Sequence, residues 1–196
     1  MALSADRLYT LERQGLAEID VEEGRIVRRH SIPEPGFPND VAVDAEGNLY
    51  ISDTGAGPLR PSRILRLRDG SVEPWLVSDE ISRANALWVH GERLLVGNSG
   101  DGILKAWDLH TRRVEDIASL GWGFIDGIRV DENGDYLVSL WEGQIYRITP
   151  SGEVTETLDL SPSRLNTADF EYLPATRTFY FPIFLANKVV AVREGG

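Results

Sequence analysis

Three polar residues recur at intervals of roughly forty residues, each near the start of a similar segment. Asn39 lies in "PNDVAVDAEGNLYIS", Asn85 in "ANALWVHGERLLVGN" and Asp126 in "IDGIRVDENGDYLVS". Two amide oxygens and a carboxylate suit a hard cation such as calcium or magnesium. They suit zinc less well, because zinc prefers His and Cys. Asn and Asp also begin strands simply because their side chains satisfy loop backbone, so the spacing alone leaves both interpretations open.

Each of these segments is a polar start, an alternating apolar strand, a polar turn and a second apolar strand. A fourth segment, "TADFEYLPATRTFYF", places Ala168 at the equivalent position. Two further strands follow in "RILRLRDGSVEPWLV", "GILKAWDLHTRRVEDIA" and "GQIYRITPSGEVTETLDL". The pattern predicts an all-β fold, a β-propeller of four-stranded antiparallel blades, with about five units present.

The alternation predicts individual strands and almost no helix. The expected strands are 41–44, 48–53, 63–68, 72–77, 86–90, 93–98, 103–109, 113–118, 127–131, 135–140, 144–149, 153–159, 169–173, 177–183 and 187–193.

The repeats predict a single propeller domain over residues 1–196. Its units are a partial unit 1–36, whole units 37–82, 83–122 and 123–164, and a partial unit 165–196. The first unit begins in or after its inner strand, and the last provides only three strands. The ring closes either with five blades or with residues missing upstream, and we favour the second. Because incomplete units leave open blade edges, we expect self-association through them.

In a propeller, the inner strands start on the side where the second strands end, so the segments that lead into the inner strands and the loops after the second strands meet at one mouth of the channel. We therefore expect Asn39, Asn85 and Asp126 to surround this mouth. The loops after the second strands bring further candidates: Asp53, Thr54, Asn98, Ser99 and Trp141. Most Trp residues fall in strands and are expected to pack between blades, but Trp122, in "GWG" before a strand start, is a candidate binding residue.

The composition removes several functional classes. The formal net charge is -11, with 31 acidic and 20 basic residues, which argues against nucleic acid and an anionic membrane surface as partners. There is no cysteine, so disulfides and thiolate sites are excluded. The three histidines fall in outer strands or turns, so a Ser-His-Asp arrangement is not expected. With no signal peptide or membrane span in the sequence as written, we expect a cytoplasmic location, unless a longer parent carries a signal.

The segments "FPNDVAVDAEGNLYISDT", "SRANALWVHGERLLVGN" and "GFIDGIRVDENGDYLVSLWEGQIYRI" resemble the regucalcin/gluconolactonase/luciferin-regenerating-enzyme (senescence-marker-protein-like) family. The likeness is greatest to bacterial members of unassigned activity, which carry similar "LNDVAVD", "PNGL" and "LDGI" motifs. It runs from about Leu8 to Arg193. The resemblance implies a six-bladed parent whose channel holds one divalent cation.

The resemblance also implies roles for the recurring residues. Asn85 and Asp126 match metal ligands, and Asp126 also matches the catalytic general base. Asn39 matches a residue near metal and substrate, and we expect substrate contacts from Asn39, Asn98, Trp122 and Trp141. The expected cation is calcium, with magnesium, manganese or zinc as alternatives. The implied substrate is a small molecule, a lactone.

One metal ligand of the family, a Glu at the start of the first blade, has no match here. The acidic residues of the first unit sit in other parts of the repeat: Glu12, Glu18, Glu22 and Glu23. The sequence therefore predicts a metal-dependent hydrolase of lactones or related small esters, impaired in this shortened chain. The alternative is a non-catalytic propeller that binds a small ligand or protein at its channel face.

Overall fold

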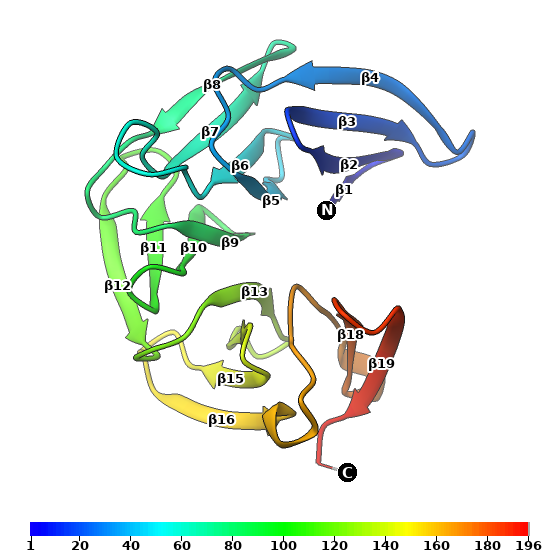
Figure 1. Cartoon of the computed structure of the whole chain (residues 1–196), viewed down its shortest axis with the longest axis vertical. Helices are drawn as coiled ribbons and strands as arrows, with labels where there is room; N and C mark the ends of the chain where they lie inside the picture. The colour runs from blue at the N-terminus through cyan, green and yellow to red at the C-terminus, as the bar shows by residue number, and fades with distance from the viewer. Residues whose placement is uncertain (196) are drawn as a thin grey trace. The chain divides into compact units, whose positions relative to one another are not determined.

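The chain folds into five antiparallel sheets that follow one another in sequence (Figure 1). The computed structural model describes residues 1–195; Gly196, the last residue of the expected fifth unit, lies outside the described residues. The first two sheets contain β1 Ala2–Ser4, β2 Arg7–Glu12, β3 Gly15–Asp20 and β4 Arg25–Ser31, then β5 Pro38–Val43, β6 Leu49–Asp53, β7 Arg63–Arg68 and β8 Ser71–Leu76.

The remaining three sheets repeat this order. They contain β9 Ala84–His90, β10 Arg93–Asn98, β11 Ile103–Asp108 and β12 Val114–Ser119, then β13 Ile125–Val130, β14 Tyr136–Leu140, β15 Gln144–Ile148 and β16 Val154–Asp159, and finally β17 Glu171–Leu173, β18 Thr178–Ile183 and β19 Lys188–Arg193. In every sheet the strands are neighbours in chain order, which is the topology of propeller blades.

The expected strands between residues 41 and 193 all form, with ends shifted by about three residues or fewer. The expected scarcity of helix is confirmed, since the helical segments in the described part of the chain are two single 3-10 turns, η1 Ser161–Ser163 and η2 Pro174–Thr176. No helix within residues 1–195 has the length and apolar character to cross a membrane. The first sheet has four strands. Its first strand, β1, has only three residues, and these pair with β2.

The strands gather into two compact units. Unit 1 comprises Met1–Val96 and Trp107–Arg113, and unit 2 comprises Gly97–Ala106 with the described residues from Val114 onward. The boundary between the units therefore passes through the third sheet.

Within unit 1, β6 shows how the sheets pack on each other. Leu49 and Ile51 point into an apolar cluster shared with the first sheet, while Tyr50 between them points into a cluster shared with β9 and β10. Successive strand residues face opposite sides, so a strand buried on both sides reads as a continuous apolar run. Leu65 and Ile64 of β7 divide between the same two clusters.

Within unit 2, the fourth and fifth sheets enclose an aromatic core. Phe170, Phe179 and Phe181 are at most 2% exposed, and their ring centroids lie 5.8–5.9 Å apart. Leu137 and Ile145 of the fourth sheet complete this cluster. The two sheets are therefore held mainly by apolar burial, with aromatic pairs adding to it.

Buried polar side chains link neighbouring sheets inside each unit. In unit 1, His30 of β4 is 5% exposed and lies between Glu18 Oε2, at 3.1 Å, and the main-chain oxygen of Gly70 in the second sheet, at 3.2 Å. In unit 2, Arg147 of β15 binds the Asp131 carboxylate and Glu194 Oε1, the latter at 2.9 Å.

The unit 2 cluster has consequences for acid stability. Burial alone would raise the pKa of Glu194, but contacts from Arg147, Arg177 and the Tyr172 hydroxyl hold that pKa below its ordinary value. Burial likewise opposes the ionised form of Asp131, yet backbone N–H groups and Arg147 lower the pKa of its carboxyl. A carboxyl with a lowered pKa stabilises the fold above its ordinary pKa, and this stabilisation is lost as pH falls through the lowered value.

We predict that Arg147→Met lowers the free energy of unfolding at pH 7 by about 3 kcal/mol, because it leaves two largely buried carboxylates without their cation. The difference from wild type should shrink below about pH 4.5, as Glu194 and Asp131 become protonated. Urea unfolding between pH 7 and pH 3 measures both effects. Arg193→Met, at an exposed position of β19, is the control and should change stability by less than about 0.5 kcal/mol. A difference that stays constant down to pH 3 would contradict the assignment.

Candidate functional site

In unit 1, the start of β5 and the loop after β6 lie together. Asn39 is half-buried, and its Nδ2 donates to Thr54 Oγ1 at 3.3 Å. Thr54 directly follows β6, so the start of the inner strand and the end of the second strand share one side of this sheet. This is the relation that the predicted topology requires.

Asn85 is the second predicted residue of unit 1, and β9 buries it. Asn85 is only 8% exposed, and its main-chain oxygen accepts a hydrogen bond from Ser52 Oγ at 2.6 Å. The preceding residue, Ala84, accepts from Thr54 Oγ1 at 2.7 Å and donates to Ser62 Oγ at 2.8 Å. The second sheet therefore fixes the backbone on which Asn85 stands.

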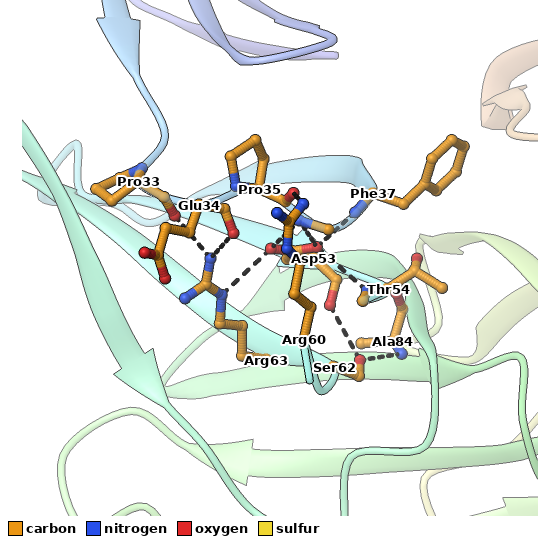
Figure 2. Close-up of polar contacts among 12 residues, drawn as sticks. Pro33, Glu34, Pro35, Phe37, Asp53, Thr54, Arg60, Ser62, Arg63 and Ala84 are labelled. Atoms are coloured by element: carbon orange, nitrogen blue, oxygen red, sulfur yellow. Dashed lines mark hydrogen bonds and ion pairs between the residues drawn. The ribbon is translucent and has the colours of Figure 1, made fainter. Parts of the chain in front are cut away.

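A cluster around Asp53 positions the segment that leads into β5 (Figure 2). Asp53 is 1% exposed and accepts from the backbone N–H groups of Gly36, Phe37 and Gly55, at 2.7–3.1 Å. Arg63 Nε also donates to its carboxylate, at 3.2 Å. These bonds commit the carboxylate to the fold, so Asp53 acts by positioning the chain before Asn39.

Arginines complete the same cluster. Arg63 Nη2 donates to the main-chain oxygens of Pro33 and Glu34, at 2.8 and 2.9 Å, and Arg60 Nη1 donates to that of Pro35 at 3.1 Å. Figure 2 shows both guanidinium groups directed at this connection between the first and second sheets. The result is an irregular segment whose backbone acceptors are satisfied by side chains from the start of β7 and from the loop before it.

In unit 2, Asp126 is a half-buried residue of β13 at a break in strand pairing. Ile125 pairs with Leu140 and Gly127 pairs with Ser139, so Asp126 is the extra residue of a β-bulge. Such a bulge changes the direction of a side chain and is frequent beside active sites.

The second sheet carries the same irregularity at the start of its inner strand. Pro38 pairs with Asp53, and pairing resumes only between Val41 and Ile51, so Asn39 lies in the irregular stretch. Two of the three recurring residues are therefore placed by the same local device in two different sheets.

Position 127, directly after Asp126, has no room for a side chain. A side chain here would begin 2.9 Å from the Phe170 ring and 3.1 Å from the Cα of Asp169. Asp169 and Phe170 belong to the segment just before β17, which lies against β13. The absence of a side chain allows this close approach and keeps the bulge packed.

The remaining predicted residues of unit 2 differ in accessibility. Asn98 ends β10, is 0% exposed, and donates from Nδ2 to Asp101 Oδ2 at 3.3 Å, so it shapes its own loop. Trp122 is fully exposed, at 103%. Trp141 is half-buried, with its ring 5.3 Å from that of Phe184 in an edge-to-face contact.

The oxygen atoms of the side chains at the strand starts are of the type that binds a hard cation. Amide oxygens of Asn39 and Asn85 are present in unit 1, and the Asp126 carboxylate is present in unit 2. No group of three or more His, Asp or Glu side chains that could hold a metal occurs within residues 1–195.

The sequence pointed to Thr54 and Ser99 as candidates at the channel mouth, but it did not reveal Ser52 and Ser139, nor that hydroxyl groups fix the strand starts. Ser99 Oγ donates to the Ile125 oxygen at 3.0 Å, and Ser139 Oγ donates to the Ala168 oxygen at 2.9 Å. These bonds repeat those made by Thr54 and Ser52 in unit 1. A signal was present, because aligned repeats carry Ser or Thr where the second strand ends.

A polar cleft also lies in unit 2, beside the turns that join β13 to β14 and β17 to β18. Ion-pairing side chains line it: Asp131, Asp135, Arg147, Tyr172, Arg177 and Glu194. Arg147 and Arg177 bind the carboxylates of Asp131 and Glu194. The charged groups of the cleft therefore serve to hold the fourth and fifth sheets together.

Five antiparallel sheets with this strand order define a β-propeller. The sequence matches the SMP-30/Gluconolactonase/LRE-like region over residues 1–170, and the chain belongs to this family. The resemblance inferred from the sequence motifs is thereby confirmed. A search of curated proteins finds no significant match.

Solved structures with the same fold are distant in sequence. A gluconolactonase from Xanthomonas campestris is 17% identical, with a TM-score of 0.72 over 96% of this chain and 68% of that chain. Virginiamycin B lyase from Staphylococcus aureus is 11% identical, with a TM-score of 0.71 over 97% of this chain and 68% of that chain. A chain of a nidogen/laminin complex is 11% identical, with a TM-score of 0.74 over 93% of this chain and 70% of that chain. The chain thus spans about two thirds of the length of these proteins.

We predict that Ser52→Ala lowers the free energy of unfolding by about 1–3 kcal/mol, because it leaves the buried oxygen of Asn85 and the buried N–H of Asp40 without their Ser52 partner. Urea unfolding followed by tryptophan fluorescence measures the change. Ser71→Ala, at an exposed position of β8, is the matched control and should be within about 0.5 kcal/mol of wild type. Equal effects of the two substitutions would show that the hydroxyl does not hold the start of β9.

Proposed function

We propose that this chain is a hydrolase that opens lactones or related small esters. The observation that carries the proposal is Asp126, a carboxylate set at a bulge at the start of an inner strand, in a chain of the gluconolactonase-like family. A half-buried carboxylate that a bulge turns out of the strand-pairing pattern is a suitable general base.

Asp126 would take the proton from a water molecule as that water attacks the ester or lactone carbonyl. The carbonyl carbon gains a bond to the water oxygen, and the carbon–oxygen bond of the ring then breaks. The proton taken up by Asp126 is returned to the leaving alkoxide. Asn39 would orient the substrate through its side-chain amide, next to Thr54.

We further propose one divalent cation, calcium, with magnesium, manganese or zinc as alternatives, for which Asn85 and Asp126 would be ligands. When bound, the ion would polarise the carbonyl and stabilise negative charge on its oxygen. The Glu that the family resemblance adds to this set has no counterpart in the chain. We therefore expect weak cation binding and low turnover in this chain, relative to a longer, six-bladed parent.

A second candidate is a non-catalytic propeller that binds a small ligand or a protein at the side where the inner strands start. It is favoured by the Glu that the family resemblance adds to the ligand set, for which the chain has no counterpart. The two candidates differ in turnover, which the first requires and the second excludes.

We predict that the purified chain hydrolyses simple five- and six-membered lactones, that a chelator lowers the rate, and that calcium restores it. Asp126→Asn should lower kcat/KM by about 100-fold or more, because it removes the base. A pH-indicator assay measures the acid released.

Glu132→Gln provides the matched control. It removes one negative charge at an exposed turn after β13, and it should retain wild-type activity. If no lactone is turned over with or without calcium, the non-catalytic candidate is correct. If Asp126→Asn is as active as Glu132→Gln, Asp126 is not the base.

A further inference from the structure

Four aromatic side chains in unit 2 form a group that we call the aromatic rim: Trp122, Phe124, Trp141 and Phe184. Trp122 is fully exposed, Phe184 is 70% exposed and Phe124 is 47% exposed. A contiguous group of large exposed apolar side chains marks an interaction site, whereas single scattered ones do not. The core of this unit does not need them, because its aromatic cluster is built from other residues.

The rim is a connected group. The N–H of Trp141 donates to the Phe124 oxygen at 2.9 Å, and the Trp141 ring contacts Phe184 edge-to-face at 5.3 Å and 69°. Gly123, which joins Trp122 to Phe124, lies against Leu140 so closely that a Cβ would meet its Cδ1 at 2.6 Å. The start of β13 and the loops after β14 and β18 therefore carry these four residues on one side of the fourth and fifth sheets, with Trp141 and Phe184 in ring contact.

The rim lies on the same side of its sheets as Asp126. Phe124 precedes Asp126 by two residues, Trp141 directly follows β14, and Phe184 directly follows β18. The other side of these sheets, where turns join β13 to β14 and β17 to β18, is charged and carries the ion-pair cluster around Arg147. Apolar surface is thus concentrated where the candidate base stands.

Two polar side chains beside the rim already form hydrogen bonds with the backbone. Glu142 Oε2 accepts from the N–H of Phe124 at 3.2 Å, and Asn166 Nδ2 donates to the Trp141 oxygen at 3.1 Å. A polyhydroxylated substrate needs several side-chain partners for its hydroxyl groups. A flat apolar ring needs only the faces and edges of aromatic side chains.

We propose that the aromatic rim binds the apolar part of the substrate. The preferred substrates are then uncharged lactones or esters with an aryl ring next to the reacting carbonyl. An anionic substrate is disfavoured by the carboxylates of Asp126 and Glu142 and by the net charge of -11. This inference rests on the proposed hydrolase function for the reaction, but the binding it describes can be measured without turnover.

The test uses two measurements on wild type, Trp122→Ala and Phe184→Ala. The first is calorimetric binding of 2-tetralone, a benzene-fused cyclic ketone that has no ester bond to hydrolyse. The second is kcat/KM for 3,4-dihydrocoumarin, the benzene-fused lactone of the same shape, and for glucono-δ-lactone, which is polyhydroxylated. Both positions are exposed, so the substitutions remove no core packing. Tyr180→Ala, at an exposed aromatic position on β18 outside the rim, is the control.

We expect wild type and Tyr180→Ala to bind 2-tetralone alike, and each rim variant to bind it about tenfold more weakly. The rim variants should lose a similar factor in kcat/KM for dihydrocoumarin and keep their rate with gluconolactone. Equal binding by all variants overturns the proposal, as does a preference for gluconolactone that the rim variants do not change. If rim variants lose 2-tetralone binding but no lactone is hydrolysed, the rim stands as a ligand site and the hydrolase function fails.

Discussion

Hydroxyl groups at the ends of the second strands hold the starts of the next inner strands, and the candidate site depends on them. Ser52 and Thr54 do this in unit 1, and Ser99 and Ser139 do it in unit 2, with donor–acceptor distances of 2.6–3.0 Å. Each bond satisfies a backbone oxygen at or just before the start of an inner strand. One such bond contributes about 1 kcal/mol, but leaving a buried oxygen unsatisfied costs more.

This constraint explains how an irregular segment can carry half-buried polar groups in fixed positions. At the start of β13 the backbone bulges, and Asp126 is the residue that the bulge turns out of the pairing pattern. At the start of β5, Asn39 lies in a similar break, and the buried carboxylate of Asp53 holds the chain just before it. The side chains that could do chemistry are thus separate from the side chains that hold the backbone.

Strand positions could be predicted because alternation with period two is a local property of the sequence. The first sheet was harder, since β1 has only three residues and Leu3 within it is exposed, which leaves no alternation to detect. The bulge at Asp126 depends on which residues of β14 oppose it, and that information is not local. For the same reason the burial of Asn98 and the contact between Trp141 and Phe184 could not be predicted from the motifs that contain them.

The proposed cation site requires the side-chain oxygens at the strand starts to bind calcium rather than only to cap the strands. Isothermal titration of calcium chloride into the chain tests it most directly, with Asn85→Ala, Asp126→Asn and the Glu132→Gln control measured in parallel. We predict one site with a dissociation constant of about 1 mM or tighter in wild type and in Glu132→Gln, and at least about tenfold weaker binding in the other two variants. Calcium affinity that is the same in all four proteins, or absent from wild type, would contradict the claim and identify these residues as strand caps.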